Sequence, residues 1–136
     1  MKILVLDDDD TRHRRFRQWF VGFDVVHAFT IEQFNREYLR GTWNYVFLDH
    51  DLNDNQYRSI EKIDGDNIPG YVGPCQRELT GKDAAHMVAE SPGNVEHVVV
   101  HSWNRSGGDE MMSILRDSDV ECTRWEFNPK EDLKLK

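Results

Sequence analysis

The chain has few cysteines, no long apolar run and no excess of basic residues. Its two cysteines, Cys75 and Cys122, have no metal-binding spacing, and we expect both to be free thiols in a reducing cytoplasm. No stretch approaches the ~20 apolar residues of a membrane-spanning helix, and the opening apolar run is too short for a signal peptide. The sequence therefore predicts a cytoplasmic protein without a membrane segment.

Negative charge exceeds positive charge. With 25 Asp and Glu against 17 Lys and Arg, the formal net charge is −8, which disfavours binding to duplex nucleic acid. A small phosphorylated ligand held through a metal ion remains compatible with this charge. Apolar residues make up 38% of the chain and charged residues 31%, as in a folded globular protein, and the length fits one domain over residues 1–136.

Apolar strand-like segments alternate with amphipathic ones. We expect strands at 2–6, 24–29, 44–48, 95–100 and 120–127, helices at 11–21, 81–91 and 109–116, and a further helix that Thr30 caps and Gly41 ends. Asp9, Asp10 or both suit the cap of the first helix. Residues 52–80 are polar and hold several glycines and prolines, which predicts a long loop or lid.

This alternation predicts an α/β fold. Right-handed crossovers between successive strands produce a parallel five-stranded sheet, and the flavodoxin-like strand order 2-1-3-4-5 places the first, third and fourth strands side by side. Only residues 130–136 follow the stop at Asn128-Pro129, so we expect the last helix of such folds to be missing.

Polar residues follow each of these three central strands. Asp7 and Asp8 end the first strand, and Asp49, His50 and Asp51 end the third. Because parallel strands end at one edge of the sheet, these carboxylates are expected to converge there. Crowded carboxylates repel each other, and either raised pKa values or a bound cation relieves the repulsion. The sequence therefore predicts a divalent metal site of Asp7, Asp8, Asp49 and Asp51, for Mg²⁺ or Mn²⁺ with Ca²⁺ also allowed.

The fourth strand runs into His101, Ser102 and Asn104, so every such polar cluster falls in the same crevice. His101 is expected to act there as a base or a metal ligand. Asn104 either contacts a phosphate or a metal, or closes a turn before the following glycines. The other histidines, His13, His27, His86 and His97, have no such neighbours and are expected at the surface or its boundary.

The acidic pattern resembles the receiver domains of two-component response regulators. The resemblance implies that Asp7 and Asp8 bind Mg²⁺ and that Asp49 matches the phospho-acceptor. Two departures stand against an ordinary receiver. Asn128 precedes Pro129 where receivers carry a lysine, and the strand-ending Asp49 is followed by a histidine and a second aspartate.

Those departures are similar to a divergent branch, the cyclic-phosphate processing receiver domains, which are found notably in phage and conflict systems. Four motifs carry the resemblance in order: Leu-Asp-Asp with Arg12 four residues after the second Asp, Leu-Asp-His-Asp-Leu at 48–52, Thr-Gly at 80–81, and His-Ser-Trp-Asn at 101–104 with Gly107 following. The resemblance implies a predicted phosphoesterase, in the host cytoplasm if a phage encodes it.

Chemistry gives each residue a role in opening a cyclic phosphodiester. His50 lies between two carboxylates, which favour its charged form, so it suits a general acid. We expect Arg12, Ser102 and Asn104 to contact the phosphate, with Arg12 supplying positive charge. The alternative for Arg12 is an ordinary surface arginine.

Two functions remain open at the level of sequence. The first is a metal-dependent phosphoesterase acting on a cyclic phosphate or cyclic-nucleotide-type molecule. The second is a non-catalytic receiver-like module that binds or sequesters a phosphorylated ligand or a protein partner. No motif identifies a protein partner. Residues 52–80 suit substrate recognition or a solvated insertion equally.

Overall fold

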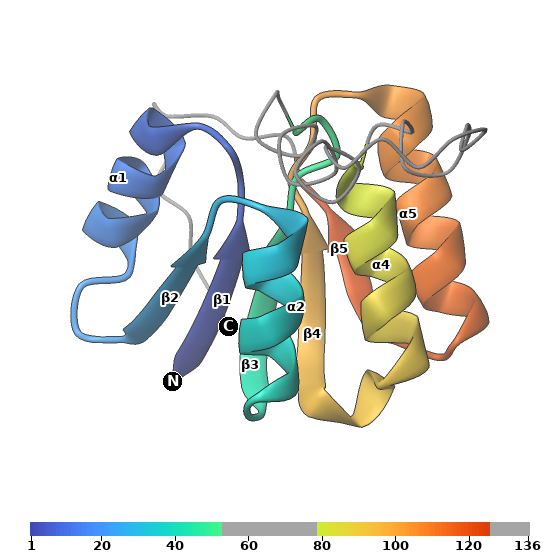
Figure 1. Ribbon diagram of the computed structural model, residues 1–136, viewed down its shortest axis with the longest axis horizontal. Coiled ribbons are helices and arrows are strands. Elements are labelled where there is room, and N and C mark those ends of the chain that lie inside the picture. Colours follow the sequence, from blue (N-terminus) through green and yellow to red (C-terminus); the bar gives the residue numbers. More distant parts are fainter. Residues whose placement is uncertain (53–78, 126–136) are drawn as a thin grey trace, which may run out of the picture.

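The computed structural model describes residues 1–52 and 79–125. Five strands form one parallel sheet in the order β2-β1-β3-β4-β5, which confirms the predicted architecture (Figure 1). The strands are β1 (Lys2–Leu6), β2 (Asp24–Ala28), β3 (Trp43–Leu48), β4 (Val95–Val100) and β5 (Cys122–Arg124). The helices are α1 (Asp10–Trp19), α2 (Ile31–Leu39), α4 (Gly81–Glu90) and α5 (Arg105–Asp117), with a 3₁₀ turn, η2, at Pro92–Asn94.

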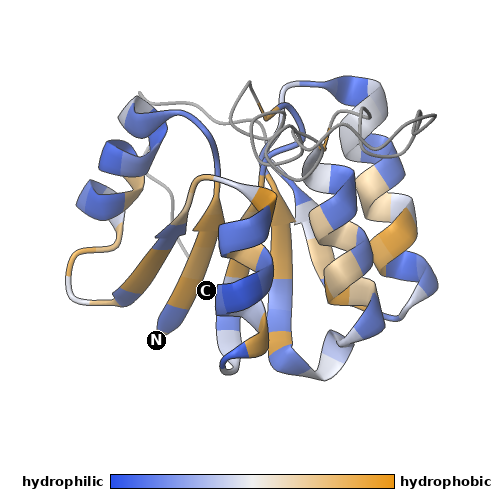
Figure 2. Cartoon of the chain, in the orientation of Figure 1, coloured by the Kyte–Doolittle hydropathy of each residue, from blue (hydrophilic) through white to orange (hydrophobic). Residues whose placement is uncertain are grey.

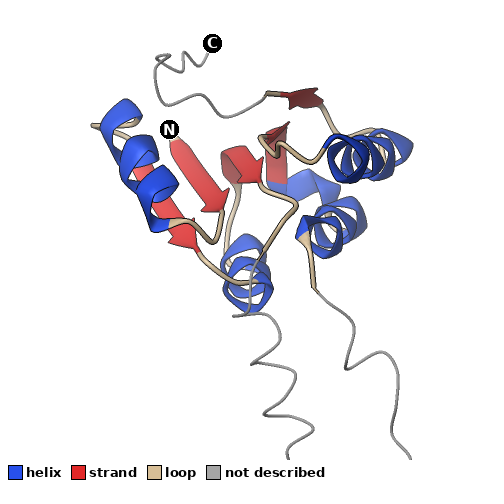
Figure 3. Ribbon diagram, turned by 90° about the horizontal axis from the view of Figure 1, so that it is seen from above, coloured by secondary structure: helices blue, strands red, loops and turns tan. Residues whose placement is uncertain are grey.

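Alternate residues of the central strands point to opposite faces of the sheet. Helices α2, α4 and α5 cover one face, where Leu4 and Leu6 of β1 pack against residues such as Phe34, Ala85 and Met111. Helix α1 covers the other face with Phe16 and Phe20, against a second apolar cluster of Ile3, Val5, Phe47 and Val99. Figure 3 shows the sheet between these helices, and Figure 2 shows apolar strands beneath helices with hydrophilic outer faces. Both faces of the strands are buried, as their unbroken apolar sequence predicts.

Side chains cap the helices where the sequence indicates. Asp9 accepts hydrogen bonds from the amides of Thr11 and Arg12 at the start of α1. Thr30 caps α2 through the amide of Gln33. A capping box between Thr80 and Asp83 starts α4. These contacts are local in sequence, which is why the pattern of residues predicts them.

Several element boundaries differ from the prediction by a residue or more, most clearly those of α5 and β5. Helix α5 begins at Arg105 instead of residue 109, because Asn104 caps it and two glycines occupy its first turn. The last strand was predicted at 120–127, and within the described part of that range, 120–125, β5 covers Cys122–Arg124, whereas residues 126 and 127 lie outside the described residues. The amide of Val120 bonds to the carbonyl of Leu115, so this residue belongs to the turn and not to the sheet.

Several expectations lie outside the described residues. They include most of the 52–80 segment, Cys75, the Asn128-Pro129 pair and the absence of a last helix. Cys122 is a free thiol, as predicted. Among the described helices, none has the length and apolar character needed to cross a membrane.

Candidate functional site

The sheet's hydrogen-bond ladder extends one residue beyond the ends of its central strands. The amide of Asp7 bonds to the carbonyl of Ala28, that of Asp49 to Leu6, and that of His101 to Leu48. Asp7, Asp49 and His101 therefore stand at the same level of the carboxyl edge, although they belong to three separate strands. Their backbones are held as firmly as the sheet itself, which fixes where their side chains begin.

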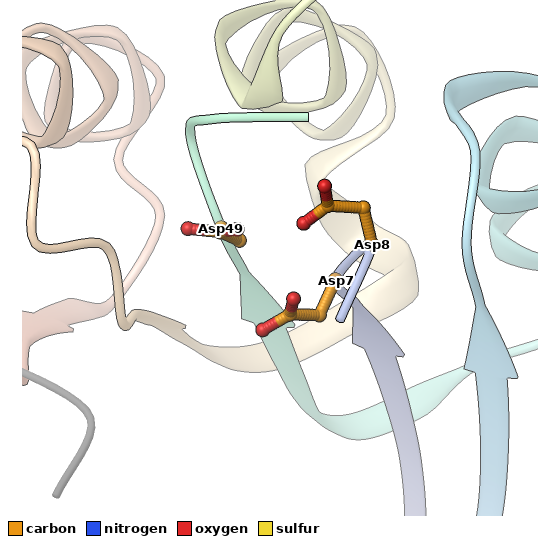
Figure 4. A group of neighbouring side chains, drawn as sticks. All are labelled: Asp7, Asp8 and Asp49. Carbon is orange, nitrogen blue, oxygen red and sulfur yellow. The ribbon is translucent and has the colours of Figure 1, made fainter. Parts of the chain in front are cut away.

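Three carboxylates meet at this edge. Asp7, Asp8 and Asp49 each offer an oxygen, and these oxygens lie within 4.8 Å of one another (Figure 4). Oxygen ligands on opposite sides of one Mg²⁺ or Ca²⁺ ion lie ~4 to 5 Å apart, so the spacing and the hard oxygen donors fit a divalent cation. Asp51, which the sequence also assigned to the metal, is not in this group and pairs with His50 instead.

The Asp7 carboxylate is fully buried and accepts four hydrogen bonds. Its Oδ1 accepts from the amide of Asp9 and from Arg12 Nη2, both at 2.9 Å. Its Oδ2 accepts from Arg12 Nε and His101 Nε2, both at 2.8 Å. Burial alone raises the pKa of Asp7, but hydrogen bonds from His101 and Arg12 outweigh burial and hold it at about 2. Asp7 is therefore a fixed negative charge.

Asp49 is also buried but has weaker compensation. Its Oδ1 accepts a hydrogen bond from the amide of His50 at 2.9 Å, and its Oδ2 accepts one from Arg12 Nη2 at 3.2 Å. Burial, with the charges of Asp7 and Asp8, raises the pKa of Asp49 to about 6, against the lowering effect of His101 and Arg12. The three carboxylates of the cluster therefore carry more negative charge than Arg12 neutralises, which favours the binding of a divalent cation.

Arg12 is the positive charge within the cluster. Beyond its bonds to Asp7 and Asp49, its Nη2 lies 3.6 Å from Asp8 Oδ1. Burial by itself lowers the pKa of Arg12, but the hydrogen bond and charge of Asp7 raise it above the ordinary value. The sequence assigned Arg12 to phosphate binding, with an ordinary surface arginine as the alternative. The position of Arg12 among the three carboxylates excludes that alternative.

His50 and Asp51 form a second, more accessible pair beside the cluster. His50 Nδ1 lies 2.7 Å from Asp51 Oδ1, and Asn104 Nδ2 donates to the same oxygen at 3.1 Å. Burial raises the pKa of Asp51, but its bonds with His50 and Asn104 together lower it overall. A Cβ atom on Gly107 would lie 2.5 Å from the His50 ring, so this glycine in α5 makes room for the imidazole.

His101 and Ser102 are buried behind the cluster. The His101 ring donates from Nε2 to Asp7 and packs against Phe16 and Phe47. Ser102 Oγ accepts a hydrogen bond from the amide of Asn104 at 3.0 Å. Asn104 Oδ1 in turn accepts from the amide of Gly107 and caps α5, the turn-closing role that the sequence left open. These contacts hold the loop in place.

The backbone around Asp49 depends on a close approach by α4. The amide of Gly81 donates to the carbonyl of His50 at 2.8 Å. A Cβ atom at this position would lie 1.9 Å from the carbonyl oxygen of Asp49, so no side chain fits there. The Thr-Gly motif thus has two structural roles: Thr80 caps α4, and Gly81 allows the helix to approach the backbone of Asp49 and His50.

Sequence reasoning missed one buried histidine. His13 was predicted at the surface or its boundary, which is wrong: it is fully buried. Its Nε2 lies 2.7 Å from the carbonyl oxygen of Asp7, and its Nδ1 lies 2.6 Å from His27 Nδ1. The contact with Asp7 is made to a backbone carbonyl, which every residue has, so no sequence motif indicates that His13 is buried beside it.

Arg124 was also missed. Its guanidinium donates to the backbone carbonyls of Ser102 and Asn104, on either side of the exposed Trp103. A Cβ atom on Gly108 would lie 2.4 Å from this guanidinium. The sequence places Arg124 only within a predicted strand. In the structure, the register of β5 sets Arg124 beside Val100 at the strand end.

The five-stranded order and the acidic edge define a receiver-like α/β protein. The model of the cyclic-phosphate processing receiver domain matches residues 2–117, and the chain belongs to that family. No curated protein matches the sequence.

Solved structures with a similar fold include response regulators and receiver domains. A CheY-like receiver domain protein from Methanospirillum hungatei JF-1 is 16% identical with a TM-score of 0.58, over 95% of this chain and 84% of that one. The receiver domain of a putative Luxo repressor protein from Vibrio parahaemolyticus is 14% identical with a TM-score of 0.61, over 94% and 80%. Response regulator DrrB of Thermotoga maritima is 19% identical with a TM-score of 0.56, and the match spans 95% of this chain but 47% of DrrB. At these identities, the likeness concerns the fold alone.

Proposed function

We propose that this protein is a metal-dependent phosphoesterase that opens a cyclic phosphate, such as a nucleoside cyclic phosphate, a cyclic nucleotide or an ADP-ribose derivative. The observation that carries the proposal is the group of three carboxylates within 4.8 Å of one another, with one arginine among them and a histidine–aspartate pair beside it. The family description, cyclic-phosphate processing, agrees with this chemistry.

Asp7, Asp8 and Asp49 would hold the divalent ion. When bound, Mg²⁺ or Mn²⁺ supplies Lewis acidity and positive charge against the phosphate oxygens. In the reaction, a water oxygen bonds to phosphorus and the bond between phosphorus and one ring oxygen breaks. The water gives up a proton, and the departing alkoxide gains one.

The exposure of each side chain at this edge indicates its role in the reaction. His50 has 15% of its side chain exposed and a carboxylate on Nδ1, so it suits proton exchange with the ligand. His101 has a fully buried side chain that is committed to Asp7, so it acts on the ligand only through that carboxylate. Arg12 has 28% of its side chain exposed and suits a phosphate oxygen.

A specific observation also favours the second function, a module that binds a phosphorylated ligand without turnover. Asp7 already accepts four hydrogen bonds, about as many as a carboxylate can accept. His101, the predicted base, is out of reach of the ligand's protons. A site in this state suits holding an anion through Arg12 as well as hydrolysing it.

The test is a screen of 2′,3′- and 3′,5′-cyclic nucleotides and of base-free ribose cyclic phosphate, each with Mg²⁺, Mn²⁺, Ca²⁺ or a chelator. Phosphorus NMR follows turnover, and calorimetry follows binding. Asp8→Asn tests the cluster, and Asp10→Asn is the matched control because Asp10 is exposed and paired with Arg14. Metal-dependent ring opening that Asp8→Asn abolishes supports the phosphoesterase. Binding without turnover supports the module, and neither binding nor turnover contradicts both.

A further inference from the structure

One nitrogen of Arg12 contacts all three carboxylates of the cluster. Nη2 lies 2.9 Å from Asp7, 3.2 Å from Asp49 and 3.6 Å from Asp8. Nε adds a second bond to Asp7 at 2.8 Å. The guanidinium therefore stands where the oxygens of the cluster point together, and it uses the same acceptors that a divalent ion needs.

The cluster has room for one cation at a time. Its carboxylate oxygens lie within 4.8 Å of one another, a span that matches a single ion with a ligand on either side. Two positive charges at that distance repel strongly in a largely buried site. A metal ion and the Arg12 guanidinium thus compete for one position.

We propose that Arg12 is a tethered cation that occupies the position of the divalent ion, and that the ion binds only when Arg12 withdraws and offers its guanidinium to the ligand's phosphate. This rests on the metal site of the proposed function. Arg12 would then decide which species the site accepts. Free metal binds weakly because it must displace a bonded arginine, whereas a metal arriving with a phosphate gives the displaced arginine a new partner.

The surroundings of Arg12 allow this movement. Its side chain is 28% exposed, so a route to solvent exists. The hydrogen bonds and ion pairs of its side chain with described residues all go to the three carboxylates, and none goes to a backbone carbonyl that would fix the guanidinium. Arg12 lies in the first turn of α1, which Asp9 caps, so its backbone stays in place while the side chain swings.

Competition between Arg12 and the metal ion should change the measured affinities for metal and for phosphate. If Arg12 competes with the metal, removing its charge tightens metal binding, although the same residue is expected to help bind the phosphate. If its release couples the two ligands, phosphate tightens metal binding in the wild type and metal tightens phosphate binding by the same factor. Such couplings are usually about 5- to 150-fold.

The first experiment titrates Mn²⁺ alone, by electron paramagnetic resonance of the free ion, into the wild type, Arg12→Gln, Arg12→Lys and Arg14→Gln. Arg14 is the matched control because it carries the same charge on the same helix but pairs with Asp10 at the exposed surface. We expect about tenfold tighter binding in Arg12→Gln, with Arg12→Lys and Arg14→Gln close to the wild type.

The second experiment measures Mg²⁺ affinity by calorimetry with and without millimolar inorganic phosphate. We expect phosphate to tighten Mg²⁺ binding at least about fivefold in the wild type and to have no such effect in Arg12→Gln.

The outcomes separate this inference from the proposed function. If the wild type binds Mn²⁺ and Arg12→Gln binds it equally or more weakly, Arg12 is not a competitor and only this inference fails. Equal tightening in Arg12→Gln and Arg14→Gln would show a general charge effect and also overturn it. If neither the wild type nor Arg12→Gln binds Mn²⁺, the metal site itself is wrong and both proposals fall. If the Arg12→Gln protein unfolds without metal, the phosphate coupling in the wild type is the deciding measurement, and Mg²⁺ binding that phosphate does not tighten would overturn this inference.

Discussion

Asp7 and His101, 94 positions apart in the chain, are joined by a buried hydrogen bond of 2.8 Å between Oδ2 and Nε2. A carboxylate only accepts, so Nε2 carries the proton. The other ring nitrogen, Nδ1, is buried without a partner among the described residues. His101 thus orients Asp7 through the hydrogen bond from Nε2. It connects the acidic edge to the aromatic cluster of Phe16 and Phe47 beneath it.

The two buried aspartates should affect stability in opposite directions. The folded pKa of Asp7, about 2, lies below the ordinary 3.8, so its charge stabilises the fold above pH 3.8 and this stability is lost as pH falls toward 2. The folded pKa of Asp49 is raised to about 6, so its charge destabilises the fold above pH 6 and the penalty disappears as pH falls toward 3.8. Shifts of roughly two pKa units correspond to about 2–3 kcal/mol each.

At pH 8 without metal, we therefore expect Asp49→Asn to stabilise the protein and Asp7→Asn to destabilise it, each by up to about 2–3 kcal/mol. Near pH 4, the gain from Asp49→Asn should nearly vanish. Urea unfolding at both pH values measures the two effects. A loss of stability in Asp49→Asn at pH 8 would mean that this carboxylate is adequately neutralised by Arg12.

A divalent ion should raise the thermal midpoint of the wild type, because it binds only the folded cluster. At one hundred times its Kd, an ion adds about 2.7 kcal/mol, which is roughly 10 °C for a chain of this size. Asp8→Asn should remove most of this shift, and Asp10→Asn should keep it. Identical melting curves in chelator, Mg²⁺ and Mn²⁺ would contradict the metal site.

Much of the fold follows from local sequence. The β1 segment is apolar from Ile3 to Leu6 and the β4 segment from Val98 to Val100, which predicts buried parallel strands. Asp9 and Thr30 cap helices within three residues of their partners. The carboxyl-edge rule then brings Asp7 and Asp49 together without any knowledge of their contacts. The convergence of the acidic residues is therefore predictable from strand order alone.

The features that escaped prediction depend on tertiary contacts. His13 bonds a backbone carbonyl, and Arg124 reaches two carbonyls from the far side of β4, so neither leaves a sequence pattern. The start of α5 was placed four residues too late because Gly107 and Gly108 resemble a turn. In the structure they are helical, and their missing side chains make room for His50 and Arg124.

Gly81→Ala should destabilise the protein strongly. The new Cβ would lie 1.9 Å from a backbone carbonyl oxygen of Asp49, which cannot rotate away as a side chain can. Either α4 or the end of β3 must shift, at a cost of about 3 kcal/mol or more. Gly93→Ala is the matched control because nothing lies within 4 Å of its Cβ position, and it should change stability little. Denaturant unfolding measures the free energy of unfolding of both variants. Equal stability of Gly81→Ala and Gly93→Ala would show that α4 moves away from the site without cost.

The pair formed by His13 and His27 should weaken the protein in mild acid. Burial, followed by the charges of His13 and Arg17, lowers the pKa of His27 to about 4. Below its ordinary value of 6.5, the unfolded chain takes up a proton that the folded protein refuses. Stability is therefore lost as pH falls from 6.5 toward 4.

Replacing His27 should flatten this part of the pH dependence. We expect His27→Gln to lose less stability than the wild type between pH 7 and pH 5, with urea unfolding at both pH values as the measurement. His86→Gln is the control because His86 is an exposed histidine of α4. Asp49 contributes with the opposite sign over part of the same range, but it is present in both variants and cancels in the comparison. Equal slopes for His27→Gln and His86→Gln would mean that His27 takes up its proton without opposing the fold.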